Sequence, residues 1–143
     1  MKLFIRQAGL RDSEFIHNLR TRSEDKKSYF SGTAISLRDH EDFWEKNYQS
    51  YWIAIKKAQR VGFYGIVKGD FRFAVIPTMR GKGIGSEMIA HAIKMSGIES
   101  VKVAKTNTAS LKCFLANGFF IKTNESLLDD CDYILLKRFE KAN

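Results

Sequence analysis

The sequence predicts an α/β fold in which a mixed, mostly antiparallel sheet of seven strands is flanked by about four helices. Three observations support this: short apolar stretches separated by turn residues, helical apolar spacing in the segments between them, and an ordinary globular composition with 44% hydrophobic and 28% charged residues. A length of 143 residues is typical of one domain and is long enough for a hydrophobic core. We therefore expect a single domain over residues 1–143.

The N-terminal part of the chain predicts one strand and two helices. Residues 1–8 alternate between apolar and polar side chains, which indicates a strand. The segment Asp12–Arg20 has apolar residues on one helical face, and Asp12 is a suitable N-cap. Ser36 and Asp39 form a variant of the capping box that opens a helix to about Tyr48, with four residues expected to face inward: Leu37, His40, Phe43 and Trp44. The polar segment 21–33 between the helices is the longest irregular connection, and loops of this length are usually functional or disordered.

The middle of the chain predicts an antiparallel meander. Residues 51–55, 61–67 and 71–76 have strand patterns. A turn near residues 57–60 joins the first two strands, and Gly69-Asp70 forms a tight hairpin into the third. Pro77 ends this last strand because it has no backbone N–H and its φ is fixed.

A glycine-rich turn follows Pro77 and leads into a helix that ends near Gly97. Gly81, Gly83 and Gly85 leave the backbone of this turn uncovered by Cβ atoms. The first amides of a helix have no partner within the helix and lie at the positive end of its dipole, so we expect this turn to bind a phosphate or pyrophosphate. The spacing fits neither the P-loop nor the dinucleotide-binding fingerprint.

The C-terminal third completes the alternation of strands and helices. Strands are expected over residues 100–105, 119–123 and 133–139, and a helix over residues 109–117. Gly118 is a suitable C′ residue for that helix. The chain shows no internal repeats, linkers or low-complexity segments.

Two motifs resemble those of the GNAT superfamily of acyl-CoA-dependent N-acetyltransferases. The first is Arg80-Gly-Lys-Gly-Ile-Gly85, which resembles the family's Q/R-x-x-G-x-G/A motif. The second is the segment Asn107–Phe119, an Asn, then a helix, then Gly-Phe opening a strand. The resemblance covers residues 60–138 and implies a GNAT-like fold with acetyl-CoA as co-substrate. An ordinary βαβ unit with a glycine turn is the alternative.

The resemblance also implies which residues hold the cofactor. In the family, the central strand and the strand after the long helix splay apart, and the pantetheine arm fills the gap like an added strand. By position, the backbone of Phe73, Ala74 and Val75 would bond the arm and polarise the thioester carbonyl. Asn107 would contact the arm from the facing side, although a helix N-cap explains this residue equally well. The pyrophosphate would be held by Arg80, Gly81, Lys82, Gly83, Ile84, Gly85 and Ser86.

The candidate acid and base residues depart in part from the family pattern. Family members commonly place a Tyr seven residues after the Asn to protonate the leaving thiolate, and Phe114 occupies that position here. An amine with a pKa of about 10.4 costs about 4.6 kcal/mol to deprotonate at pH 7, whereas a thiol near 8.5 costs only about 2 kcal/mol to ionise. Activity without the phenol is therefore plausible, with water, Cys113 or Ser110 as proton donors. Asp70 is the best candidate for a general base acting through water, with a turn residue as its alternative, and His40 is a second candidate.

The acceptor is predicted from the N-terminal region. The segment from Leu19 to Trp44 resembles GNAT enzymes that acetylate nucleotide-linked amino sugars, including the pseudaminic-acid group, although Thr21 replaces the usual Asn. Under this hypothesis Arg20 and Lys27 would bind a diphosphate, and Tyr29 or Trp44 would contact a ring face. Acetylation of a protein N-terminus or lysine, acetylation of a small amine, and a non-catalytic CoA-binding or RNA-associated module are the alternatives.

The charge and cysteine content limit the partners. The formal charge of +8 favours anionic partners, but the basic residues lie in short scattered groups, so nucleic acid is unlikely to be the partner. Cys113 and Cys131 are too few for a disulfide framework, and no signal peptide or membrane-spanning segment is evident. We expect a cytoplasmic protein without a metal, acting on a small-molecule or nucleotide-sugar amine, and a homodimer is left open.

Overall fold

The computed structural model describes residues 3–20, 36–121 and 133–138. These residues form two compact units, Met1–Ile84 and Gly85–Asn143, which we describe separately. Lys27, Tyr29 and Cys131 from the sequence analysis lie outside the described residues, as does the whole irregular segment 21–33. No helix in the described ranges has both the length and the apolar character needed to cross a membrane.

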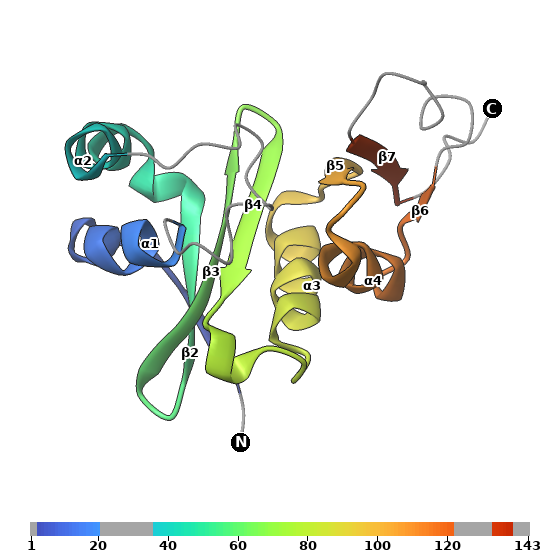
Figure 1. The fold of residues 1–143 in the computed structure, drawn as a ribbon, viewed down its shortest axis with the longest axis horizontal. Coiled ribbons are helices and arrows are strands. Elements are labelled where there is room, and N and C mark those ends of the chain that lie inside the picture. The colour runs from blue at the N-terminus through green and yellow to red at the C-terminus, as the bar shows by residue number, and fades with distance from the viewer. Residues whose placement is uncertain (1–2, 21–35, 122–132, 139–143) are drawn as a thin grey trace. The chain divides into compact units, whose positions relative to one another are not determined.

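The first unit contains a four-stranded sheet and two α-helices (Figure 1). The sheet order is β1-β2-β3-β4, and all three pairs are antiparallel, which confirms the predicted meander. The strands are β1 (Phe4–Gln7), β2 (Tyr51–Lys56), β3 (Gln59–Val67) and β4 (Asp70–Val75), and the α-helices are α1 (Ser13–Arg20) and α2 (Leu37–Asn47). Short 3-10 helices precede α1, follow α2 and follow β4: η1 (Leu10–Asp12), η3 (Tyr48–Ser50) and η4 (Pro77–Met79).

Two-residue turns connect the strands of the meander. Lys57 and Ala58 join β2 to β3, and Lys68 and Gly69 join β3 to β4, all four with positive φ. Such left-handed pairs suit a hairpin because their twist matches that of the strands. Asp70 is therefore the first residue of β4 and not a turn residue.

The core of the first unit lies where α1 and α2 pack on one face of the sheet (Figure 1). Its buried members are Ala8, Ile16, Leu19, Trp44, Tyr51, Ile53, Phe63 and Val67. Ser36 caps α2 as predicted, since its hydroxyl accepts the N–H of Asp39 at 3.1 Å. Leu37 is 50% exposed, so its predicted inward position is wrong. Leu37 lies on the same helical face as His40 and Trp44, but it is the first residue of α2, at the end of the helix.

Asp12 does not cap α1 as predicted but lies at the centre of an ion-pair cluster. Its carboxylate accepts two bonds from Arg6, both 2.9 Å long, one from Arg60 at 3.1 Å, and one from the N–H of Gly9 at 2.8 Å. The side chain is completely buried. Burial alone would raise the pKa of Asp12, but the bonds from Arg6 and Gly9 and the charges of both arginines lower it below its ordinary value.

The second unit contains two α-helices and a three-stranded antiparallel sheet of order β5-β7-β6. Its elements are α3 (Ile84–Ser96), which begins at the last residue of the first unit, β5 (Ser100–Ala104), α4 (Thr108–Ala116), β6 (Phe120–Ile121) and β7 (Tyr133–Lys137). Gly118 follows α4 with φ +87° and donates to Leu115 O at 3.2 Å, which confirms the predicted C-terminal cap.

The strands form two sheets, of four and three strands, where the sequence analysis predicted one sheet of seven. Among the described residues, β4 pairs with β3 and β5 pairs with β7, so no ladder of hydrogen bonds joins the two groups. Local alternation predicts that a segment is a strand but carries no information on which strand lies beside it, so the division was not predictable from the pattern. The single acetyltransferase domain stays a prediction.

Candidate active site

The backbone of β4 alternates between its two edges. The N–H of Ile76 donates to Val61 O at 2.8 Å, so this is a hydrogen-bonded pair of the antiparallel ladder. The register is constant along β3 and β4, so Ala74 forms the next such pair, with Phe63. The backbone groups of Phe73 and Val75 therefore face the other edge of β4, which is the last strand of its sheet.

This alternation separates the three residues that the sequence analysis assigned to the pantetheine arm. Phe73 and Val75 direct their peptide groups away from β3, as an added strand would require. Ala74 directs its peptide groups to Phe63, and its side chain packs against the core. The backbone of Ala74 is therefore in the wrong orientation for the predicted contact.

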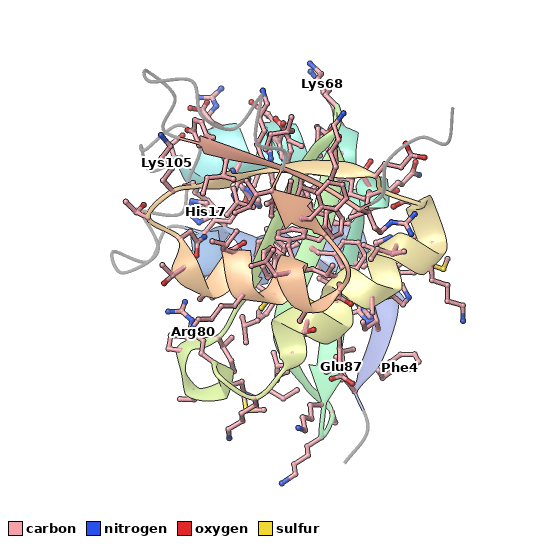
Figure 2. All side chains as sticks on the ribbon, turned by 90° about the vertical axis from the view of Figure 1, so that its right-hand side faces the viewer. Phe4, His17, Lys68, Arg80, Glu87 and Lys105 are labelled. Atoms are coloured by element: carbon pink, nitrogen blue, oxygen red, sulfur yellow. The ribbon has the colours of Figure 1, made fainter. Side chains whose placement is uncertain are left out.

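The segment after β4 is held to the strand by Arg80. The guanidinium Nε of Arg80 donates to Val75 O at 3.0 Å, and the N–H of Arg80 donates to Pro77 O at 3.3 Å in the 3-10 turn η4. Arg80 lies on the loop between η4 and α3 (Figure 2). The Arg80 side chain therefore ties its own loop, which is predicted to bind the pyrophosphate, to the end of β4, which is predicted to bind the pantetheine arm.

The loop that follows has the backbone that its glycines predict. Gly81 and Gly83 have φ values of +76° and +85°, and nothing lies within 4 Å of a Cβ placed on either residue. Glycine is thus needed there for backbone conformation, not for space. The residues from Pro77 to Ser86 include no carboxylate. The loop therefore presents Lys82 and exposed backbone, and the first carboxylate after it is Glu87 in the first turn of α3.

Asn117 holds the first turn of α3, a role that the sequence analysis missed. Its amide nitrogen lies 3.1 Å from Ser86 O, 3.0 Å from Ser86 Oγ and 2.9 Å from Cys113 O. These bonds join the C-terminal end of α4 to the helix turn predicted to bind pyrophosphate. The only signal in the sequence was an Asn before Gly118, and this pattern also describes an ordinary helix end.

The start of α4 has the predicted cap. The side-chain oxygen of Asn107 accepts the N–H of Ser110 at 3.2 Å, so the N-cap explanation is confirmed, while the contact to the cofactor stays a prediction. Phe114 is buried, with its ring 5.2 Å from that of Phe119 in an edge-to-face contact. Burial raises the pKa of the Cys113 thiol above its ordinary value, so the thiol keeps its proton at neutral pH.

The two candidate catalytic residues occupy different environments. Asp70 is exposed at the start of β4, next to the hairpin tip from which Lys68 projects (Figure 2). His40 is 1% exposed, with its Nε2 3.0 Å from Ser13 O and its ring stacked on Trp44 at 5.9 Å. Burial, together with the charge of Arg20, lowers the pKa of His40 to about 4, although the bond to Ser13 opposes this shift. These contacts favour a structural role for His40, joining α2 to α1, over proton transfer.

Comparison with known proteins identifies the family. The sequence matches the Acetyltransferase (GNAT) family over residues 14–119. The chain belongs to the GNAT family of acetyltransferases. It is thus an N-acetyltransferase that uses acetyl-CoA, so the non-catalytic alternative is no longer needed. None of the curated proteins compared with this GNAT chain matches it.

Solved structures share the fold of this GNAT acetyltransferase at low sequence identity. A domain from Methanocaldococcus jannaschii is 17% identical with a TM-score of 0.77, over 94% of this chain and 96% of that one. The spermidine N-acetyltransferase from Vibrio cholerae, solved with CoA and spermine, is 17% identical with a TM-score of 0.77, over 94% and 93%. The Salmonella typhimurium protein yncA, solved with its cofactor acetyl-CoA, is 14% identical with a TM-score of 0.73, over 100% and 98%.

The residues of this GNAT chain fit the cofactor in three respects. Phe73 and Val75 direct their peptide groups toward the outer edge of β4, where Val75 O already accepts from Arg80 Nε. The loop through Gly81 and Gly83 has positive φ and no carboxylate. The first turn of α3, fixed by Asn117, brings helix N-terminal amides to the end of that loop, where a phosphate is stabilised by the helix dipole.

Proposed function

We propose that this GNAT enzyme transfers an acetyl group from acetyl-CoA to the primary amine of a nucleotide-linked amino sugar. The observation that carries this acceptor is a pair of guanidinium groups in the first unit. Arg20 at the end of α1 and Arg72 in β4 lie 5.8 Å and 5.5 Å from the centre of the same Phe43 ring. Together they form a positively charged aromatic site next to the strand that carries the arm-binding residues.

This charge favours an anionic acceptor over a polycation. A nucleoside diphosphate group is attracted by two guanidinium groups, which bind phosphate oxygens in a bidentate manner. The same two guanidinium groups would repel a positively charged polyamine. The spermidine N-acetyltransferase of Vibrio cholerae shares the fold, but that likeness does not transfer its acceptor to this chain. The net charge of +8 acts in the same direction as the local pair.

In the proposed reaction the neutral amine attacks the thioester carbonyl, a C–N bond forms, and the C–S bond breaks. Acetyl-CoA, when bound, supplies the activated acetyl group. The outward N–H groups of Phe73 and Val75 stabilise the negative charge that develops on the carbonyl oxygen. Asp70 accepts the amine proton through water. Deprotonating the amine at pH 7 costs about 4.6 kcal/mol, which is more than the about 2 kcal/mol needed to form the free thiolate.

The chain offers two side chains that could return a proton to the leaving thiolate. Phe114 has none to give and is part of the core. Cys113 lies next to it in α4 and is protonated at neutral pH because burial raises its pKa. Ser110 is buried one turn earlier, with its N–H bonded to Asn107. Cys113→Ser keeps an O–H donor at this position and should keep most of the activity. Cys113→Ala combined with Ser110→Ala removes both side-chain donors, so full activity of that variant would leave water as the donor.

The acceptor is tested by measuring thiol release from acetyl-CoA with a panel of amines: UDP-linked amino sugars, spermidine, a peptide α-amine and a lysine peptide. We expect turnover with the amino sugars. Arg72→Gln should raise the KM for the sugar nucleotide about tenfold or more and leave the KM for acetyl-CoA unchanged. Arg38→Gln, at an exposed arginine of α2, is the matched control and should change neither value. Turnover with spermidine alone would overturn the proposed acceptor.

The base is tested by a separate substitution. Asp70→Asn removes the proton acceptor while keeping the shape and position of the side chain at the start of β4. We expect kcat/KM to fall about 100-fold at neutral pH and to recover partly at high pH, where free amine becomes abundant. An unchanged pH profile of kcat/KM would remove Asp70 from the mechanism.

A further inference from the structure

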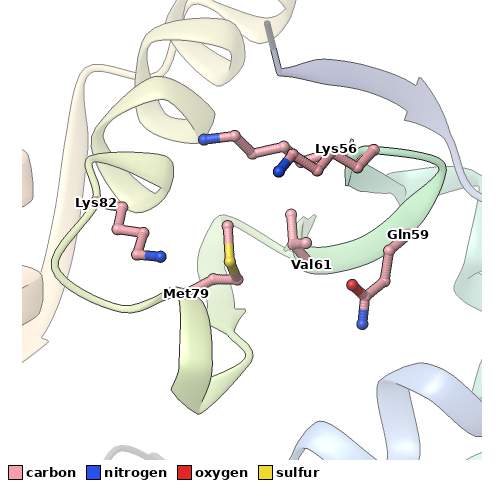
Figure 3. Close-up of a pocket in the computed structure, with 6 residues that line it drawn as sticks. Lys56, Gln59, Val61, Met79 and Lys82 are labelled. Atoms are coloured by element: carbon pink, nitrogen blue, oxygen red, sulfur yellow. The ribbon is translucent and has the colours of Figure 1, made fainter. Parts of the chain in front are cut away.

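A cluster of three lysines, Lys56, Lys57 and Lys82, lines a cavity of about 180 Å³ in the first unit. Lys56 ends β2, Lys57 is in the β2–β3 turn, and Lys82 lies between the two loop glycines. Figure 3 shows Lys56 and Lys82 entering from different elements around the space that Val61 and Met79 also line. This volume is well above the roughly 10–15 Å³ that one ordered water molecule needs, so the space has room for a small anion.

Among the described residues, this lysine cluster has no local counter-charge. The remaining lining residues are Gln59, Val61 and Met79, so no carboxylate reaches the cavity. Within the described part of the chain, the ion pairs connect Asp12 with Arg6 and Arg60 and involve none of the three lysines. Like charges gathered around a cavity repel one another unless an anion lies between them.

The hairpin turn between β2 and β3 places two members of the cluster side by side. Lys57 and Ala58 have φ values of +52° and +62°, a conformation that costs a residue with a Cβ free energy that glycine avoids. The turn sets Lys57 directly beside Lys56, so two of the three ammonium groups come from consecutive residues at the tip of one hairpin.

We propose that the lysine cluster binds the 3′-phosphate of coenzyme A, apart from the backbone site for the pyrophosphate. The proposal rests on the proposed function, because it assumes that acetyl-CoA binds along the loop that contains Lys82. A phosphate monoester carries close to two negative charges at pH 7 and three acceptor oxygens, which suits three ammonium donors. Lysine suits this role because its flexible ammonium needs no fixed orientation toward the phosphate.

The decisive experiment compares the binding of CoA and 3′-dephospho-CoA by calorimetry at low salt. We expect the wild-type enzyme to bind CoA about tenfold more tightly, since three partly solvated pairs each contribute a modest amount. The double substitution Lys56→Ala with Lys57→Ala should remove most of this preference and leave the affinity for 3′-dephospho-CoA unchanged. Lys46→Ala with Lys94→Ala removes two exposed lysines elsewhere and is the matched control. It should keep the tenfold preference.

The outcomes separate this proposal from the function on which it rests. Equal affinity of the wild-type enzyme for the two ligands would overturn the 3′-phosphate site and leave the acetyltransferase function standing. Failure of both ligands to bind would overturn the proposed use of the loop by the cofactor. If the double variant weakened both ligands equally, the two hairpin lysines would hold another part of the cofactor, and the assignment would also fail. Inorganic phosphate that bound without competing with CoA would show a site for a separate anion, which overturns the proposal as well.

Discussion

The first unit carries two groups of cations that differ in what they face. Arg6 and Arg60 meet the buried carboxylate of Asp12 at 2.9 Å and 3.1 Å, so their charge is used within the fold. The lysine cluster of Lys56, Lys57 and Lys82 surrounds a cavity that has no carboxylate among its described lining residues. The comparison teaches that a net charge of +8 does not by itself indicate a binding surface. What matters is which cations the protein has left without an internal partner.

The largest effect should come from breaking the paired group. Asp12→Asn leaves both arginines charged but without a negative partner and replaces one carboxylate oxygen with an amide donor, so we expect a loss of about 3 kcal/mol in the free energy of unfolding. Chemical denaturation measures it. Lys56→Ala with Lys57→Ala should change stability by no more than about 0.5 kcal/mol, because these side chains are not bonded within the fold. A comparable loss in both variants would refute the distinction between the two groups.

Acid should also destabilise the first unit, because two of its buried side chains, His40 and Asp12, have lowered pKa values. In the folded protein the pKa of His40 is about 4 rather than 6.5, so the side chain stays neutral there. Its contribution to the free energy of unfolding is therefore present above pH 6.5 and is lost as the pH falls toward 4. Asp12, whose pKa is also lowered, loses its contribution below its ordinary value of 3.8.

His40→Gln isolates the histidine, since the Gln amide can still donate to Ser13 O. We expect the wild-type protein to lose about 2–3 kcal/mol between pH 7 and pH 4 and the variant to lose clearly less. Parallel stability curves from pH 7 to pH 4 would contradict the assignment of the buried neutral histidine.

Asn117 extends the comparison to the second unit, because its side-chain amide is hydrogen-bonded to Ser86 in the first turn of α3, which is predicted to bind the pyrophosphate. Asn117→Ala removes the bonds to Ser86 and should raise the KM for acetyl-CoA about fivefold, with a smaller change in kcat. Asn47→Ala is the matched control, because Asn47 also donates its amide four residues back, to Phe43 O at 2.8 Å, at the end of a helix. Equal effects of the two substitutions on KM would leave Asn117 with only a capping role.

The smallest effect tests the strained turn that carries Lys57. Ala58→Gly relieves a positive φ in the second position of the turn and should stabilise the protein by about 1 kcal/mol at most. Gly69 occupies the same position in the other hairpin, with nothing within 4 Å of a Cβ placed there, so Gly69→Ala should destabilise by a similar amount. Thermal unfolding of both variants measures the two shifts, and shifts of the same sign would exclude backbone strain as their cause.

Local patterns predicted the elements well and the links between distant residues poorly. Alternation located β2, β3 and β4 within a few residues, and Ser36 and Gly118 marked helix ends because caps depend on neighbours in sequence. The cluster of Arg6, Asp12 and Arg60 could not be predicted, because its members meet only after β1 and β3 have paired with β2.

The candidate site was predicted to a similar extent. The glycine loop and the strand before it were found because their residue types follow from backbone needs at fixed spacing. The orientation of Ala74 depends on the register between β3 and β4, and the bonds of Asn117 depend on how α3 and α4 pack. Neither follows from local sequence.

The alternation of backbone groups between the two edges of β4 also limits which insertions and deletions this strand can tolerate. With the hairpin end of β4 held in register, one residue inserted after Asp70 would exchange the two sets of peptide groups downstream of it and would turn core side chains such as Ala74 to the opposite face. Changes in length are therefore expected to accumulate in the hairpin tips and to be selected against inside this strand. The six-residue length of β4 therefore fixes which peptide groups face its outer edge.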